Sequence, residues 1–222
     1  MKIRILLAFS VLLFVFYSCA PTRIVKPLEV GEKQVGVTFG GPLINFSGAV
    51  IPIPFTSVWG AYGLDSLTST WVGVHTTSMA FADLQTDFGF TRKIYSSTNK
   101  FLPSVSISPI VNFMHSFRDA QSRFYPELDL NIYWETPKKM YYLTFSNWFV
   151  INSFRAHNES QPQHWIPTVN GGLFLNKKGK FNYQLELRYL APFNENKSVV
   201  EYFSLTNTGA LGIYFGMTYK LK

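Results

Sequence analysis

Hydrophobic and polar residues alternate in single steps along most of the chain after residue 32. Side chains of an extended strand point to opposite faces with a period of two, so such alternation predicts β-strands with one apolar and one polar face. The clearest segments are 34–40, 84–91, 105–113, 127–134, 181–189 and 210–221. Four less regular strands are expected near 54–63, 67–77, 140–152 and 165–176. No helical period or internal repeat interrupts this pattern, so residues 33–222 are predicted to form one domain.

The connections between these strands are alternately short and long. The short turns are 64–66, 136–139 and 176–180, and the longer connections are 41–53, 114–123, 153–164 and 192–207. Two connections depart from this order, since 78–82 is short and 93–102 is longer than a tight turn. The arrangement predicts an all-β, antiparallel, up-and-down barrel of about ten strands, within a range of about eight to twelve.

Three features of the pattern favour a barrel that crosses a membrane. The strands are long enough, because a tilted transmembrane strand needs about 9–11 residues. The polar face consists of Ser, Thr, Asn, Gln, Gly and Tyr with few charges, whereas a surface in water is normally rich in charged residues. Aromatic residues flank the apolar stripes, as Phe124 and Trp134 do in one strand and Phe181 and Tyr189 in another. Aromatic girdles of this kind are typical at the two interfaces of a bilayer.

The composition agrees with this interpretation and excludes other classes of protein. Charged residues make up 15% of the 222 residues, against roughly 25% in soluble domains. Aromatic residues make up 17%, and the single Cys excludes an intrachain disulfide and a cysteine-rich zinc site. The formal net charge is +7, but the basic clusters at 138–139 and 177–180 fall in predicted turns. No pattern of a nucleic-acid-binding module accompanies them, so we expect solvated turn charges and no nucleic-acid partner.

The N-terminus has the features of a targeting segment. Lys2 and Arg4 precede an apolar run at 5–17, which is too short for a helix that spans a membrane. The only Cys, Cys19, follows Ser18 at the end of this run, which resembles a bacterial lipoprotein signal except that Phe16 stands where Leu is usual. The resemblance implies a signal peptide at 1–18 and covalent lipid on Cys19. Residues 19–32 are then a polar, lipidated tether before the barrel domain at 33–222.

The last strand adds a second resemblance. Residues 212–221 alternate as in the C-terminal strand of bacterial outer-membrane β-barrels, although the chain ends on Lys222 and not on an aromatic residue. The chain as a whole resembles a small outer-membrane β-barrel lipoprotein. This resemblance implies recognition of the last strand by the barrel-insertion machinery, both termini on the periplasmic side, and the Cys19 lipid in the inner leaflet of the outer membrane.

Ionisable residues on the polar face are the candidate functional residues. They are Asp87, Glu127, Asp129, Glu186, Arg188 and His75. A barrel of about ten strands is narrow enough for side chains to fill most of it, and charges there must be paired or hydrogen-bonded. Two interpretations stay open: a structural salt-bridge network, or the lining of a narrow pore or small-ligand site. No particular ligand is indicated.

Two other classes of protein remain as alternatives. A barrel-based hydrolase would use a rim cluster such as His75 with Ser78, or His115 and Ser116 with Asp119, but neither matches a known motif. His157 and His164 flank a predicted loop and are expected to be solvated. No phosphate-binding or zinc-protease motif is present, so no catalytic residue, cofactor or metal is predicted. In the second alternative, the chain is a periplasmic, lipocalin-like lipoprotein whose apolar stripes face inward around a lipid.

Overall fold

Eleven strands and one helical turn make up a computed structural model that describes residues 21–99, 101–153, 160–176, 179–195 and 202–221. Cys19 and the predicted signal peptide lie outside the described residues. The elements are β1 Lys33–Phe46, β2 Ala49–Pro52, β3 Thr56–Gly63, β4 Thr68–His75, α2 Thr76–Met79, β5 Asp83–Tyr95, β6 Ser104–Ser116, β7 Gln121–Glu135, β8 Lys139–Phe149, β9 Trp165–Leu175, β10 Phe181–Glu195 and β11 Thr208–Leu221.

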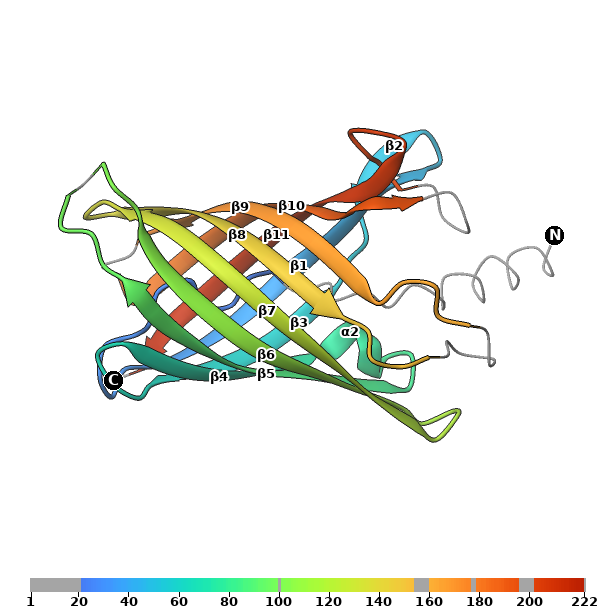
Figure 1. Ribbon diagram of the computed structural model, residues 1–222, viewed down its shortest axis with the longest axis horizontal. Coiled ribbons are helices and arrows are strands. Elements are labelled where there is room, and N and C mark those ends of the chain that lie inside the picture. The colour runs from blue at the N-terminus through green and yellow to red at the C-terminus, as the bar shows by residue number, and fades with distance from the viewer. Residues whose placement is uncertain (1–20, 100, 154–159, 177–178, 196–201, 222) are drawn as a thin grey trace.

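Ten of the strands close into an antiparallel barrel (Figure 1). Each pairs with its neighbours along the chain, and β1 pairs with β11 from Lys33 opposite Leu221 to Pro42 opposite Gly212. The short strand β2 forms a hairpin with the last residues of β1 and lies outside the closed wall. The predicted ten-stranded, up-and-down barrel is therefore confirmed, and closure leaves none of the wall strands with an unpaired edge.

The two ends of the barrel differ in their connections. The turn end holds Lys33, Leu221 and the connections β3–β4, β5–β6, β7–β8 and β9–β10, whereas the loop end holds β2, α2 and the remaining connections. The long connection expected at 114–123 is in fact a tight turn at 117–120, because β6 and β7 pair as far as Ser116 opposite Gln121. The helical turn α2 was not predicted. No described helix is long and apolar enough to cross a membrane.

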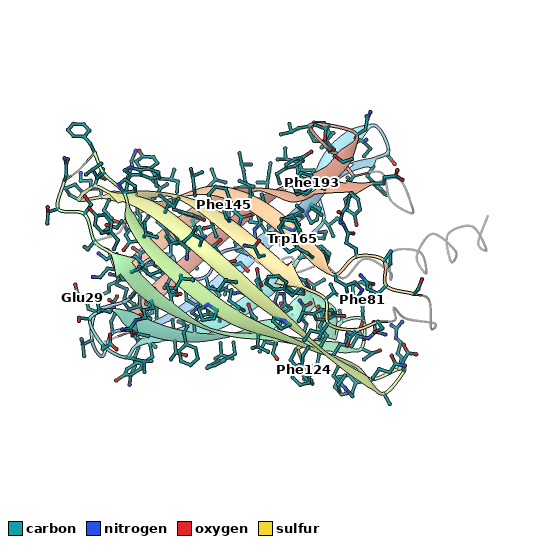
Figure 2. The ribbon with its side chains drawn as sticks, viewed as in Figure 1. Glu29, Phe81, Phe124, Phe145, Trp165 and Phe193 are labelled. Atoms are coloured by element: carbon teal, nitrogen blue, oxygen red, sulfur yellow. The ribbon has the colours of Figure 1, made fainter. Side chains whose placement is uncertain are left out.

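The wall has its apolar face outside and its polar face inside. In β1, Val35, Val37 and Phe39 are more than 40% exposed, while Gln34 and Thr38 between them are buried. The same alternation continues through the other strands, and Figure 2 shows side chains such as Phe145 projecting outward along the barrel. A protein folded in water has the opposite pattern, with its apolar residues inside.

Large aromatic side chains that face the lumen lie over glycines of the neighbouring strand. Trp59 is opposite Gly36, and Trp71 is opposite Gly89. A Cβ atom on Gly36 would overlap the Trp59 indole, and one on Gly89 would lie 2.5 Å from a ring carbon of Trp71. These glycines therefore create the room that lets indole rings lie flat inside a narrow barrel.

Candidate functional site: a lumen filled by the N-terminal segment

Residues 21–28, here called the lumen segment, lie inside the barrel. All are buried except Lys26, which is half-buried. The segment enters at the turn end, where the Leu28 N–H donates to Ser69 Oγ at 2.7 Å and the Gly31 N–H donates to the carbonyl of Gly63 at 2.9 Å. The polar tether expected here is instead part of the core, because Ile24, Val25 and Leu28 find apolar partners within the lumen.

Wall side chains bind the backbone of the lumen segment, which has no strand partner of its own. Gln184 Nε2 donates to the carbonyl of Thr22 at 2.9 Å, and Thr91 Oγ1 donates to the carbonyl of Ile24 at 3.0 Å. Ser106 Oγ donates to the carbonyl of Val25. These bonds satisfy backbone groups that would otherwise be buried without partners, which is costly.

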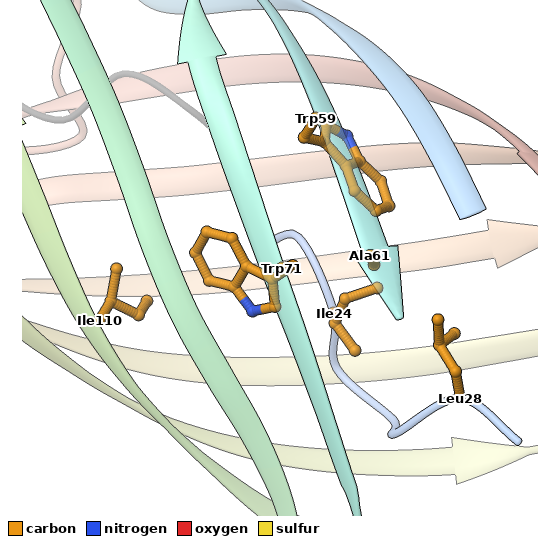
Figure 3. Close-up of a cluster of buried hydrophobic side chains, with 6 residues drawn as sticks. All are labelled: Ile24, Leu28, Trp59, Ala61, Trp71 and Ile110. Carbon is orange, nitrogen blue, oxygen red and sulfur yellow. The ribbon is translucent and has the colours of Figure 1, made fainter. Parts of the chain in front are cut away.

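Two apolar clusters hold the side chains of the segment. Ile24 and Leu28 pack in a cluster with Trp59, Ala61, Trp71 and Ile110 (Figure 3). Val25 packs in a second cluster with Tyr133, Met140 and Tyr142. Burying a large aliphatic side chain contributes about 1.5–3 kcal/mol, so these contacts favour the inserted position of the segment.

Arg23 is the charged centre of the segment and is only 3% exposed. Its Nη2 and Nε lie 2.9 and 3.0 Å from Asp87 Oδ2. Its Nη1 donates to Ser57 Oγ at 2.7 Å and approaches Thr38 Oγ1 at 3.4 Å. The guanidinium group is thus held by side chains from β1, β3 and β5, in a low-dielectric interior where a charge-assisted hydrogen bond is strong.

The six residues predicted for the lumen all lie inside the barrel, and all are buried. Asp87 binds Arg23 and also faces His75, whose Nε2 lies 3.7 Å from Asp87 Oδ1. Glu186 and Arg188 form an ion pair, with 3.0 Å between Arg188 Nε and Glu186 Oε1. Arg188 also lies over the Tyr214 ring, 5.7 Å from its centroid.

Glu186 links the ion pair to the lumen segment. The backbone N–H of Thr22 lies 3.2 Å from Glu186 Oε2, which also accepts a hydrogen bond from the Tyr142 hydroxyl. Tyr142 in turn accepts from Gln184 Nε2 at 2.7 Å. A carboxylate with several donors around it can stay charged while buried, so Glu186 is anchored from the wall and from the segment.

Glu127 and Asp129 form a second pair of carboxylates two residues apart on β7. Asn112 Nδ2 donates to Glu127 Oε2 at 2.9 Å, and Asp129 is paired in register with Ser146 of β8. No described hydrogen bond joins either residue to the lumen segment. The buried charged side chains among the described residues are Asp87, Glu127, Asp129, Glu186, Arg188 and Arg23, with His75 in addition. Carboxylates therefore outnumber guanidinium groups four to two.

The mouth at the turn end carries weaker, more exposed ion pairs. Lys26 Nζ lies 3.0 Å from Glu135 Oε1, and Lys220 Nζ lies 3.3 Å from Glu32 Oε1. Partial burial acts to raise the pKa of Glu32, but hydrogen bonds from Gln34 and the Glu29 N–H, together with the charge of Lys220, lower that pKa below its ordinary value. Glu32 is thus held as a carboxylate where the chain leaves the lumen for β1.

The clusters considered for catalysis are arranged differently from a catalytic triad. Ser78 Oγ donates to Gln85 at 3.0 Å, and His115 Nδ1 contacts Ser122 Oγ at 2.9 Å on the exposed rim. His164 Nδ1 contacts the carbonyl of Val150, and His157 lies outside the described residues. Within the described part of the chain, no group of three His, Cys, Asp or Glu residues could hold a metal ion.

Arg23 and its hydroxyl partners Ser57 and Thr38 were missed from the sequence. Ser57 and Thr38 do lie on the polar faces of expected strands, but nothing distinguished them from other polar residues there. The available signal was the apolar pair Ile24 and Val25, together with Pro27, which favours an extended conformation at Lys26. Such a segment is more apolar than a solvated tether needs to be.

The fold and the site together define a class: a closed β-barrel with an apolar exterior, a polar lumen and an internal segment that fills the lumen from the turn end. No known protein-family model and no curated protein sequence matches this chain.

Solved structures with a similar arrangement are barrels of low sequence identity. The NanC porin is 10% identical with a TM-score of 0.47, over 85% of this chain and 100% of that chain. The translocator domain of the autotransporter NalP from Neisseria meningitidis is 9% identical with a TM-score of 0.45, over 89% of this chain and 91% of that chain. An outer membrane channel from Pseudomonas putida F1 is 8% identical with a TM-score of 0.45, over 91% of this chain and 100% of that chain. At these values the likeness transfers no residue and no activity to this chain.

Proposed function

We propose that this protein is an integral β-barrel of a bacterial outer membrane and acts as a narrow channel that its own lumen segment closes. The observation that carries the membrane assignment is the inverted wall, with apolar side chains outside and polar side chains inside. In a hydrocarbon environment every backbone group must be paired within the protein, and a closed barrel meets that requirement. The turn end then faces the periplasm, since periplasmic turns are short.

The inverted wall argues against a periplasmic lipid carrier. A lipocalin-like protein would need an apolar lumen for its ligand, but this lumen is lined by residues such as Asn131, Asn170 and Glu186, all fully buried. The apolar residues of the same strands point outward, where a soluble barrel would expose them to water.

Lipid on Cys19 is the second part of the proposal, and it gives the segment two alternative positions. Cys19 precedes Pro21 by two residues, which span at most about 7 Å. Pro21 is buried in the lumen when the segment is inserted. A Cys19 whose acyl chains lie in the inner leaflet therefore requires the segment to leave the lumen. Insertion closes the channel, and lipid anchoring on the periplasmic side opens it.

Membrane insertion is tested first, with the full chain and its Cys19→Ala variant. A membrane barrel stays folded in detergent sample buffer until boiled, so both proteins should shift in electrophoretic mobility on heating. Both should also require detergent for solubility. If Cys19→Ala is soluble without detergent, the membrane assignment is wrong.

Closure by the segment is tested by conductance in planar bilayers. Arg23→Glu places a carboxylate against Asp87 and should expel the segment without altering the wall. We expect brief, small, cation-preferring openings for the unlipidated wild-type protein and sustained openings for Arg23→Glu. The control is Val30→Glu, which adds a carboxylate at an exposed residue outside the lumen without removing a cation. Equal conductance of Arg23→Glu and Val30→Glu would contradict closure by the segment.

A further inference from the structure

The guanidinium group of Arg23 lies in a pocket of the barrel wall that belongs to four different strands. Asp87 of β5, Ser57 of β3 and Thr38 of β1 supply its acceptors. Gly73 of β4 pairs with Asp87, and a Cβ atom there would lie 3.0 Å from Arg23 Nη2 and would overlap Asp87 Oδ1. The wall is thus recessed at the position where a planar cation lies.

We propose that this pocket is a binding site for guanidinium-type cations, which Arg23 occupies as an internal ligand. Ser57, Thr38 and Asp87 are all buried, and they are present in the wall whether or not the lumen segment is inserted. Asp87 uses its Oδ2 for Arg23, while its Oδ1 faces His75 Nε2 at 3.7 Å, beyond ordinary hydrogen-bonding distance. The pocket therefore has acceptor capacity beyond what the segment uses.

Departure of the lumen segment removes the guanidinium partner of Asp87. With the segment inserted, two guanidinium groups face four carboxylates among the described buried residues. When the segment leaves, as the proposed function above requires, Arg188 is the remaining guanidinium group, and Asp87 loses its guanidinium partner and is left facing the His75 ring at 3.7 Å. A buried carboxylate without a partner is strongly disfavoured, so a free cation with the donor geometry of Arg23 is expected to take its place.

Chemical rescue of Arg23→Ala in the full-length, detergent-folded protein tests this site. The variant should melt several degrees below the wild-type protein. Low-millimolar guanidinium chloride should restore most of that loss with a saturable dependence on concentration, whereas equal concentrations of urea or sodium chloride should not. If Arg23→Ala does not fold unaided, the fraction that becomes heat-modifiable with and without guanidinium is measured instead, and an increase with guanidinium alone is expected.

Two further variants test whether the rescue by guanidinium is specific to this pocket. Arg23→Ala combined with Asp87→Asn should lose the response to guanidinium, because the anion of the site is gone. Lys26→Ala removes a cation of the same segment at the exposed mouth and should show no response. The proposed site is wrong if guanidinium restores the melting temperature of Arg23→Ala no more than urea does. It is also wrong if guanidinium raises the melting temperature of Lys26→Ala by the same amount. Wild-type heat modifiability is measured in parallel, so loss of the rescue is distinguished from failure of the membrane assignment.

Discussion

Two pairs of carboxylates face the lumen, and their charges are compensated in different ways. Asp87 and Glu186 both contact the lumen segment, through the Arg23 side chain and the Thr22 N–H. Glu127 and Asp129 have their described hydrogen-bonding partners on the wall, such as Asn112, and lie in a lumen where four acidic side chains face two guanidinium groups. The first pair therefore binds the segment, whereas no described hydrogen bond joins the second pair to it. Different strands thus carry the two pairs: β5 and β10 carry the pair that binds the lumen segment, and β7 carries the other.

The largest effect is expected from Arg188→Ala, which removes the only buried wall guanidinium among the described residues. Glu186 loses the ion pair at 3.0 Å and is left as a buried charge. Breaking a buried pair in this way costs about 3–5 kcal/mol, so the variant should melt well below the wild-type protein and unfold at lower denaturant. Denaturant titration in detergent, followed by heat modifiability, measures the difference.

The matched control for this variant is Arg92→Ala. Arg92 is exposed at the turn end and donates to Thr68 Oγ1 at 3.2 Å. Its removal should change the free energy of unfolding by less than about 0.5 kcal/mol. An unchanged stability of Arg188→Ala would show that the ion pair does not hold the lumen together.

Asp87→Asn should have the next largest effect, because it weakens the contact between the wall and the segment. The amide that replaces the carboxylate keeps an acceptor oxygen for Arg23 but loses the negative charge. Hydrogen bonds to charged groups contribute about 1.5–3 kcal/mol, and a loss of that size in the free energy of unfolding is expected. In bilayers the variant should also open more often than the wild-type protein. If Asp87→Asn and Arg23→Ala reduce stability additively in a double-mutant cycle, the two side chains are not coupled.

Strand faces could be predicted from the sequence, whereas the position of the lumen segment could not. A period of two determines which neighbour faces inward, so Leu185 outside and Glu186 inside follow directly from the alternation. The segment has no period, and its position depends on partners far away along the chain: Asp87 is 64 residues from Arg23, and Glu186 is 164 residues from Thr22. Those contacts exist only after the barrel closes, so no local pattern encodes them.

A smaller effect is expected from Lys26→Ala, which tests whether the segment is held by its mouth or by its interior. The Lys26 and Glu135 side chains are 38% and 28% exposed, so solvent screens their ion pair. Exposed pairs of this kind contribute at most about 1 kcal/mol. Unfolding in low and high salt measures the contribution, which should be smaller in high salt. A loss as large as that of Asp87→Asn would place the main anchor of the segment at the mouth.

Asp129→Asn should have the smallest effect on stability, and it separates the two carboxylate pairs most directly. It removes one acidic group from a lumen in which acidic side chains already outnumber guanidinium groups. The amide keeps an acceptor for its neighbour across the strand pair, Ser146, and repels Glu127 less. The free energy of unfolding should therefore change by less than about 1 kcal/mol or rise slightly, in contrast to the loss in Asp87→Asn.

In Arg23→Glu channels, Asp129→Asn should reduce the preference for cations, measured as a shift of the reversal potential in a salt gradient. If Asp129→Asn lowers the free energy of unfolding as much as Asp87→Asn does, the two side chains contribute equally to stability. The distinction between the two carboxylate pairs would then be wrong.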